Sequence, residues 1–462
     1  MIGYKLREEF LNGDKDLKEY YEVLFDRIEE LEDLNIFISY DEEKVKKRLD
    51  EIEQKDEKGA LYGIPFTLKD NISMKGMGLT CGSKMLKDFE AVYDATVTKR
   101  ILDEDGVILG KVNMDEFAMG SSSETSYFGV TKNPLDPERI PGGSSAGSCA
   151  AVASGIGAIS LGTDTGGSTR QPASYCNVMG YMPSYGTFSR YGVVSMANTL
   201  DQVGIVANTV KDIVLTANII GGQDEKDMVT TEQEKLDFTD EALDISGVKI
   251  GILSLDEFDI EEEVRKDYDL ALEQLKAMGA ELIALDFKYL KYALPLYNVI
   301  MSAEVSSNMS RFDGIRYGFQ AEDYEDTRDL YVKTRSQGFG EEVKRRIAMG
   351  THYLSSSDDQ LIYKQGLKVR RLLAEEFYEK YEEVDFIATP TVTNLPCKIG
   401  ERIEDPLAMY DSGSFNVPVN LAGLCAISMP VRKGLSSSIQ FIGNRYGDKQ
   451  LLQMAAAWEG RK

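Results

Sequence analysis

The first part of the chain, residues 4–58, is rich in charged residues and places its apolar residues at helical spacing. The positions that show this spacing are Leu17, Tyr20, Tyr21, Leu24, Ile28 and Leu31. Such spacing is typical of amphipathic helices that lie on a core, and Asp14 and Asp41 are suited to cap two of them. We therefore expect residues 1–58 to form an N-terminal helical segment, packed on a domain that comprises residues 59–462.

From Gly59 onwards, short apolar runs alternate with stretches of helical periodicity. The runs expected to be strands are 61–68, 106–111, 247–253, 280–287, 384–389, 426–431 and 438–442, and the stretches expected to be helices are 94–100, 261–278, 290–312, 337–382 and 448–458. The helical stretch 337–382 is interrupted near Ser357 and Asp358, either of which can cap a new helix. This alternation favours an α/β architecture, with residues 247–287 forming a β-α-β unit.

Charge and composition exclude several classes of function. The 462 residues include 52 Lys and Arg against 77 Asp and Glu, a net charge of −25 at pH 7, which argues against a dedicated nucleic-acid surface. No apolar run of membrane-spanning length and no signal-peptide pattern occurs, so we expect a soluble, cytoplasmic protein.

The five cysteines form no C-x-x-C pair and are expected to be reduced core residues. The single histidine, His352, excludes a multi-histidine metal site, and we expect it at the surface or at a helix end.

The candidate chemistry is concentrated between Pro141 and Pro172. Two loops of small residues, Gly142–Ser145 and Thr165–Ser168, each end their glycines on serine, and an apolar run between them, Cys149–Leu161, is expected to be a helix leading into a strand. Glycines allow successive N–H groups to converge on one oxygen. Such a nest binds either a phosphate or the oxyanion of an acyl-transfer intermediate.

The residues beside these loops favour acyl transfer. A phosphate-binding P-loop requires a lysine after its last glycine, and neither loop has one. Acyl transfer requires a nucleophile, for which Ser168 is suited, and a base. Lys69, at the end of an apolar strand, can be that base if the site lowers its pKa by about 2–3, which corresponds to about 3–4 kcal/mol. Ser144 can relay the proton between Lys69 and Ser168 if it reaches both.

The chain resembles the amidase signature family at these same residues. The resemblance is carried by the lysine of Leu68–Asn71, the serine of Gly142–Ser145 and the serine of Asp164–Pro172. It implies a single α/β domain with a central mixed β-sheet covered on both faces by helices. It also implies a Ser-Ser-Lys hydrolase in which Ser168 is acylated, Ser144 follows a cis peptide bond after Gly143, and Lys69 is the base. The oxyanion would lie on the N–H groups of Thr165, Gly166, Gly167 and Ser168.

Within that family, the likeness is to the ammonia-producing subunits of tRNA-dependent amidotransferases. The stretches that carry it are Glu116–Ser121, Ser189–Gly192, Arg311–Gly318, Gly338–Ile347 and Pro418–Leu424. It implies that glutamine is hydrolysed here, that ammonia passes to a partner B subunit with a small C subunit between them, and that tRNA is bound by the partner. No cofactor is implied in this chain, since ATP and Mg²⁺ belong to the partner. Arg346 would bind the α-carboxylate of glutamine, with Tyr297 beside it.

Some residues depart from the family's pattern. Ala146, Met182 and the run Leu424–Ala426 differ from the usual residues, and the aspartate expected to hold the substrate's ammonium falls on Gly413, with Asp411 two residues away. Either Asp411 holds the ammonium or glutamine selectivity is weakened. Two other hypotheses therefore remain beside glutamine hydrolysis, namely a stand-alone amidase acting on another small amide and a catalytically retired scaffold subunit.

Overall fold

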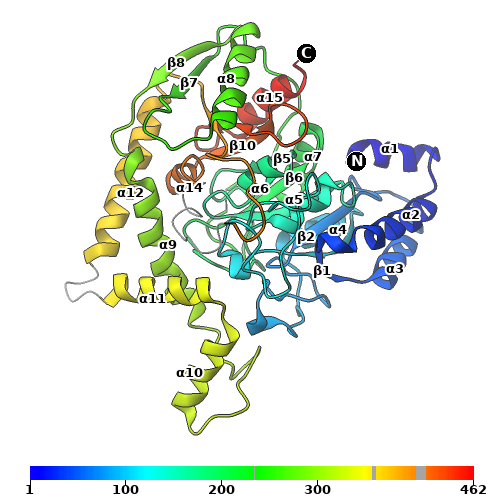
Figure 1. Ribbon diagram of the computed structural model, residues 1–462. Helices are drawn as coiled ribbons and strands as arrows, with labels where there is room; N and C mark the ends of the chain where they lie inside the picture. The colour runs from blue at the N-terminus through cyan, green and yellow to red at the C-terminus, as the bar shows by residue number, and fades with distance from the viewer. Residues whose placement is uncertain (231, 234, 356–360, 402–412, 462) are drawn as a thin grey trace.

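The computed structural model describes residues 1–230, 232–233, 235–355, 361–401 and 413–461. One eleven-stranded sheet runs through these described residues, in the order β1-β3-β2-β4-β6-β5-β10-β11-β9-β7-β8. The pairs β2–β3, β2–β4, β7–β8 and β7–β9 are parallel, and the remaining neighbours are antiparallel. The sheet is therefore mixed, and helices flank it (Figure 1), which confirms the predicted fold class.

The strands and helices have the following bounds. The strands are β1 (Phe37–Tyr40), β2 (Pro65–Lys69), β3 (Val107–Val112), β4 (Ile159–Asp164), β5 (Met179–Met182), β6 (Gln202–Ala207), β7 (Lys249–Leu253), β8 (Glu281–Leu285), β9 (Phe386–Pro390), β10 (Cys425–Pro430) and β11 (Ser438–Gly443). The helices are α1 (Gly3–Asn12), α2 (Leu17–Glu30), α3 (Glu42–Glu53), α4 (Thr96–Asp103), α5 (Ala146–Ala153), α6 (Arg170–Tyr175), α7 (Val210–Ile220), α8 (Glu262–Ala277), α9 (Ala293–Met309), α10 (Thr327–Gly338), α11 (Glu341–Ser355), α12 (Leu361–Lys380), α14 (Val417–Ala422) and α15 (Asp448–Glu459).

The N-terminal helices follow the predicted pattern, with one difference in their caps. Asp41 caps α3 by accepting a hydrogen bond from the N–H of Lys44 at 3.1 Å, as predicted. The cap of α2 is Asp16, which accepts from the N–H of Glu19 at 2.8 Å, and not Asp14. Asp14 lies instead in the turn after α1, where its own N–H donates to the carbonyl of Glu9 at 2.9 Å. A side chain can cap only the helix that begins directly after it.

The same N-terminal segment also contributes a strand, which the helical pattern did not predict. β1 pairs antiparallel with β3 at the edge of the sheet. Its four residues are half-buried, so they show no alternation that would distinguish a strand. Buried side chains of α1, α2 and α3 belong to the same hydrophobic cluster as those of β2, β3 and β4. The division of the chain after residue 58 stays a prediction.

The candidate catalytic segments meet at the carboxyl ends of two adjacent strands inside the sheet. β2 and β4 are adjacent and parallel, so their carboxyl ends point the same way. Lys69 is the last residue of β2, and the second glycine–serine loop begins directly after β4. Binding sites of α/β proteins commonly lie outside the carboxyl ends of such strands. α5, the predicted small-residue helix between the two loops, packs closely beside these ends because Gly147 leaves no room for a Cβ, which would meet the main chain of Asn113 at 2.6 Å.

A second hydrophobic cluster forms beside the sheet, around α9, α11, α12 and α14. These helices stand together on one side of the molecule, and α10 projects below them, as Figure 1 shows. α11 ends at Ser355 and α12 begins at Leu361, and the predicted interruption, with its candidate caps Ser357 and Asp358, lies outside the described residues. β7, α8 and β8 form the predicted β-α-β unit, since β7 and β8 pair in parallel.

Candidate active site

Lys69 lies at the centre of a buried cluster of hydroxyl groups. Its Nζ is 2.8 Å from the Oγ of Ser144, 3.0 Å from the Oγ of Ser145 and 2.8 Å from the Oγ1 of Thr163. Thr163 comes from β4, which runs beside β2, whereas the two serines come from the first glycine–serine loop. No carboxylate lies within ion-pair distance of this Nζ among the described residues. The lysine is therefore hydrogen-bonded but has no direct counter-charge.

This environment changes the protonation of Lys69. The side chain is fully buried, and burial lowers its pKa to about 7, against the opposing effect of the negative charges of Asp115 and Asp164. Burial removes the water that stabilises an ammonium ion, so the neutral amine becomes accessible near neutral pH. A neutral amine has a lone pair, and it can accept a proton from a hydroxyl within hydrogen-bond distance.

Asp115 is a neighbour of the first loop that the sequence did not single out. Its carboxylate is buried against Gly143, where a Cβ would meet its Oδ2 at 2.0 Å, so only glycine fits before Ser144. The peptide bond between Gly143 and Ser144 is cis, as the resemblance implies. Thr125 donates to the Oδ1 of Asp115 at 2.8 Å. Burial raises the pKa of Asp115.

Ser168 lies on the second loop and faces a cavity. The two loops are joined through the main chain, because the N–H of Ser145 donates to the carbonyl of Ser168 at 3.0 Å. The cavity is lined by Ala118, Gly120, Ser121, Gly143, Gly166, Gly167, Ser168, Gln171, Leu294, Tyr297, Asn298, Arg346, Gly413 and Val417. The structure describes no hydrogen bond between the hydroxyls of Ser168 and Ser144. Thus the predicted contact between Lys69 and Ser144 is formed, and the predicted contact between Ser144 and Ser168 is not.

The carboxylate of Asp164 holds the second loop in shape. It accepts hydrogen bonds from the N–H of Gly167 at 2.8 Å and from the N–H of Thr169 at 3.0 Å. The predicted oxyanion donor Gly167 is therefore engaged with Asp164 in this structure. The N–H groups of Thr165, Gly166 and Ser168 donate to no partner in the described part of the chain. Gly167 has a φ of +114°, a backbone conformation that favours glycine.

Asp164 is in turn held by a buried network that sequence reasoning did not assign. Arg170 donates to Asp164 through Nε at 3.1 Å and through Nη2 at 3.0 Å, and both side chains are fully buried. Asn420 of α14 donates to Asp164 at 2.9 Å, and Gln440 of β11 accepts from Arg170 at 2.7 Å. Burial raises the pKa of Asp164, but the charge of Arg170 and these hydrogen bonds more than offset this effect and lower it to about 2. The carboxylate stays ionised at neutral pH.

Thr165 is anchored from the other side of the loop. Its hydroxyl donates to the Oδ1 of Asp201 at 2.8 Å, and the Oδ2 of Asp201 accepts from the N–H groups of Met196 and Ala197, each at 2.9 Å. Burial raises the pKa of Asp201 to about 6. The only signal for these carboxylates in the sequence was that each lies beside a glycine-rich or polar turn. Their partners are distant in the chain, so local patterns did not reveal their roles.

The predicted substrate-binding residues are distributed around the same cavity. Tyr297 of α9 lies against Gly166, where a Cβ would meet its ring at 2.8 Å. Arg346 of α11 is buried, and its Nε donates to the Oε1 of Glu342 at 2.7 Å. Gly413, at the position of the expected aspartate, also lines the cavity. Asp411 lies outside the described residues.

The histidine and the five cysteines do not line this cavity. His352 is exposed near the end of α11, as predicted, and all five cysteines are buried, also as predicted. The described residues contain no group of three or more His, Cys, Asp or Glu side chains that could hold a metal ion. In the same part of the chain, no helix is both long and apolar enough to cross a lipid bilayer.

Comparison with known proteins identifies the family of this chain. The family model described as Amidase matches residues 19–452. The chain belongs to the amidase family. This amidase is 44% identical over 470 residues to the A subunit of glutamyl-tRNA(Gln) amidotransferase from Clostridium botulinum strain Hall, covering 99% of this chain and 96% of the relative. It is 45% identical over 466 residues to the protein of the same name from Caldanaerobacter subterraneus, covering 99% of this chain and 95% of that one.

Solved structures lead to the same family. The amidase matches the crystal structure of the glutamyl-tRNA(Gln) amidotransferase A subunit from Thermotoga maritima with a TM-score of 0.80 and 40% identity, over 95% of this chain and 90% of that one. It also matches a 6-aminohexanoate cyclic dimer hydrolase with a TM-score of 0.86 and 23% identity, over 100% of this chain and 96% of that one. At that identity the second likeness shows a shared fold alone.

Proposed function

We propose that this amidase hydrolyses the side-chain amide of glutamine through an acyl-enzyme on Ser168. The observation that carries the proposal is the buried contact of 2.8 Å between the Nζ of Lys69 and the Oγ of Ser144, next to Gly143, which lines the same cavity as Ser168. The pKa of Lys69, lowered to about 7 by burial, makes the neutral amine available as a base. A serine nucleophile activated in this way needs no histidine.

The proposed reaction first acylates Ser168 and then hydrolyses the acyl-enzyme. The hydroxyl of Ser168 turns towards Ser144 and gives it a proton, while Ser144 gives its own proton to Lys69. The oxygen of Ser168 then forms a bond to the amide carbon, and the carbonyl oxygen becomes an oxyanion. When the carbon–nitrogen bond breaks, the proton returns from Lys69 through Ser144 to the nitrogen, which leaves as ammonia. Water attacks the ester by the same route and releases glutamate and free Ser168.

The loop after β4 supplies the electrostatic part of the proposal. The N–H groups of Thr165, Gly166 and Ser168 are the donors that we propose for the oxyanion, because the N–H of Gly167 is bound to Asp164. One such donor typically contributes about 2.7–4 kcal/mol to lowering the barrier. The bonds of the loop to Asp164 and Asp201 hold these donors in place before the substrate arrives.

The charged end of glutamine requires partners at the wall of the cavity. We propose that Arg346 binds the α-carboxylate, since a guanidinium matches a carboxylate in shape and charge. Its position at the cavity wall, beside Tyr297, supports this role. For the substrate's ammonium, Asp411 remains the proposed partner, because Gly413 at the cavity has no side chain that could serve.

The near-complete match to one component of an amidotransferase supports a role in an assembly. The relatives are named as the A subunit of glutamyl-tRNA(Gln) amidotransferase. We propose that this chain likewise supplies ammonia to a B subunit, with a small C subunit bound to both. ATP, Mg²⁺ and the aminoacyl-tRNA would be handled by the partner. The net charge of −25 supports this division, since it disfavours direct binding of tRNA by this chain.

The experiment that tests the proposal is the release of ammonia from glutamine, measured with and without B and C subunits taken from a relative. We expect turnover of glutamine that the partners stimulate, and none in Ser168→Ala. Turnover of unrelated small amides by the isolated chain, with none on glutamine, would instead support a stand-alone amidase, which Gly413 favours. Loss of labelling by a serine-directed acylating probe in Ser168→Ala distinguishes both from a retired scaffold, which would not be labelled at all.

A further inference from the structure

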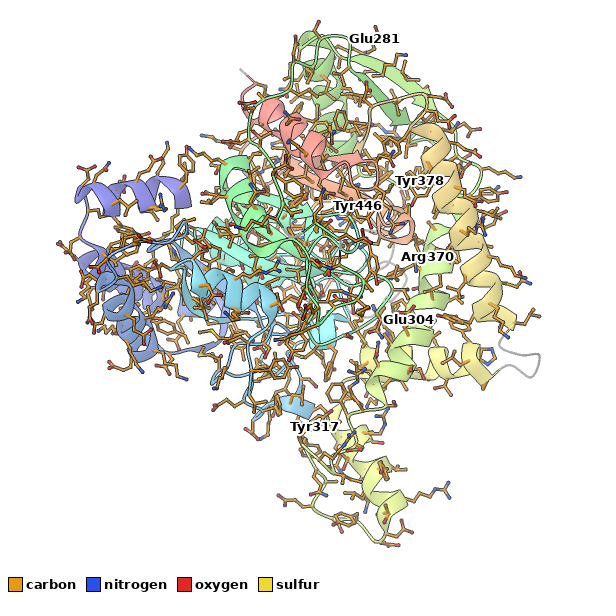
Figure 2. All side chains as sticks on the ribbon, turned by 180° about the vertical axis from the view of Figure 1, so that it is seen from behind. Glu281, Glu304, Tyr317, Arg370, Tyr378 and Tyr446 are labelled. Atoms are coloured by element: carbon orange, nitrogen blue, oxygen red, sulfur yellow. The ribbon has the colours of Figure 1, made fainter. Side chains whose placement is uncertain are left out.

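A second hollow lies on the opposite end of α14 from the candidate active site. Its volume is about 250 Å³, and it is lined by Tyr185, Leu367, Arg370, Arg371, Ala374, Tyr378, Leu421, Ala422, Gly423 and Arg445. Val417, at the first turn of α14, lines the catalytic cavity, whereas Leu421 and Ala422, at the last turn, line this hollow. Figure 2 shows Arg370 and Tyr378 on α12.

Three guanidinium groups converge on this hollow in a chain whose net charge is −25. Arg371 forms an ion pair with Glu375 at 2.7 Å, in which the arginine side chain is 80% exposed. Arg370 and Arg445 form no ion pair with any carboxylate in the described residues. The carboxylate of Glu304 is connected to Arg370 only through Thr199. The hydroxyl of Thr199 donates to Glu304 at 2.6 Å and accepts a hydrogen bond from Arg370 at 2.8 Å.

Arg370 is the least solvated of the three arginines. Its remaining bonds go to neutral oxygens, namely the carbonyls of Leu421 at 2.8 Å and Thr199 at 2.9 Å. Burial lowers its pKa, which reflects the cost of keeping its charge away from water. A partly buried charge with no direct counter-ion is costly unless an ion of opposite sign joins it. The wall of the hollow therefore carries a guanidinium that the charge of Glu304 offsets only in part and that no carboxylate of the described residues contacts directly.

Two tyrosine rings are held rigidly at the wall of the hollow. The hydroxyl of Tyr185 accepts from Arg190 at 2.9 Å and donates to the carbonyl of Asn198 at 2.7 Å, which fixes its ring at the edge of the hollow. Tyr378 donates to the carbonyl of Ala422 at 3.1 Å, which fixes a second ring there. The planar guanidinium of an arginine between such rings can bind a carboxylate or a phosphate through two donors at once.

We propose that this hollow is a binding site for a small oxyanion, that is, a ligand whose recognised group is a carboxylate or a phosphate. Arg445 and Arg371 contact the ligand from the open side, and Arg370 supplies its charge from the wall. Both anion types suit the forked donors of arginine. The site is independent of amide hydrolysis, so its test does not require that the proposed reaction be correct.

The test is calorimetric titration of the full chain with inorganic phosphate and, separately, with citrate, at constant ionic strength set by chloride. We expect one of the two to bind at a single site, and the better ligand identifies the anion class. Arg445→Gln and Arg371→Gln are each expected to weaken binding about tenfold or more, the loss of one charge-assisted hydrogen bond. Arg316→Gln, which removes the same charge from a side chain that is 65% exposed elsewhere, is expected to bind like the wild type.

Two outcomes would overturn the proposal. One is that neither anion binds at millimolar concentration. The other is that binding is equally strong in wild type, Arg445→Gln and Arg371→Gln. Both variants alter exposed side chains, so a thermal unfolding scan without ligand is expected to show an unchanged midpoint. Tyr378→Phe, which retains the ring and loses one hydroxyl, serves as a second, milder variant and is expected to weaken binding less than either arginine substitution.

Discussion

The Nζ of Lys69 and the Oγ of Ser144 lie 2.8 Å apart in the interior of the protein, although 75 residues separate them in the chain. The contact arises because β2 ends beside β4, and the first glycine–serine loop lies across the ends of both strands. An amine and a hydroxyl in this position can exchange a proton without any water between them. The proposed reaction depends on this pair.

The two adjacent serines are expected to differ in importance. Ser144→Ala should lower the rate of ammonia release about 100-fold or more, because it removes the proposed proton relay. Ser145→Ala is the matched control, since its hydroxyl also lies 3.0 Å from Lys69 but donates to the carbonyl of Thr163 at 3.1 Å. We expect a loss smaller than about tenfold there. Equal losses in steady-state assays of the two variants would contradict the assigned relay.

The pH dependence of the reaction should reflect Lys69. The base acts as the neutral amine, and its pKa is about 7. Below that pH the neutral fraction falls with each unit of pH, so kcat/KM should fall about tenfold per unit towards acid and level off above neutral pH. The measurement is kcat/KM for glutamine between pH 5 and 9. A profile that is flat across this range would show that another group is the base.

Asp115→Asn should move that profile. The negative charge of Asp115 raises the pKa of Lys69, so its removal lowers that pKa and shifts the acidic limb to lower pH. Asparagine retains the shape that packs against Gly143. Asp88→Asn, at a side chain that is 82% exposed, is the control and should leave the limb in place. An unchanged limb in Asp115→Asn would mean that this carboxylate has no electrostatic effect on Lys69.

Arg170→Met should destabilise the fold more than an ordinary surface change. It leaves the buried carboxylate of Asp164 without its ion-pair partner, and breaking a buried pair in this way typically costs about 3–5 kcal/mol. Lys99→Met, which removes one partner of an exposed pair on α4, should cost less than about 1 kcal/mol. Urea unfolding of both variants measures the difference. Similar unfolding midpoints for the two variants would show that the ion pair between Arg170 and Asp164 does not stabilise the fold.

The strands and helices predicted from the sequence were those with strong local patterns. The β2 strand that ends at Lys69 and the unit of β7, α8 and β8 follow from apolar runs and helical spacing, and both are confirmed. β1 was not predicted because its four half-buried residues obtain their hydrogen bonds from β3, about 70 residues away. A short edge strand depends on its distant partner and not on its own pattern.

The residues of the candidate site were also predictable only where the local sequence was sufficient. Lys69, Ser144 and Ser168 could be chosen from residue type and spacing, because each ends a recognisable strand or loop. The carboxylates that shape the site could not, since Asp164 depends on Arg170 and on Asn420 of α14, which is 256 residues away in the chain. The sequence also could not show that the N–H of Gly167 is bound to Asp164, because this bond depends on the conformation of the loop.

The most direct test of the account is the rate at which Ser168 is acylated in Lys69→Met. A serine-directed acylating probe is added to wild type and variant, and mass spectrometry of the peptide that contains Ser168 follows the adduct over time. We expect an adduct on Ser168 in the wild type and a rate about 10²–10⁴-fold lower in a Lys69→Met protein that remains folded. A near-normal rate in that variant, or an adduct on a different serine, would contradict it.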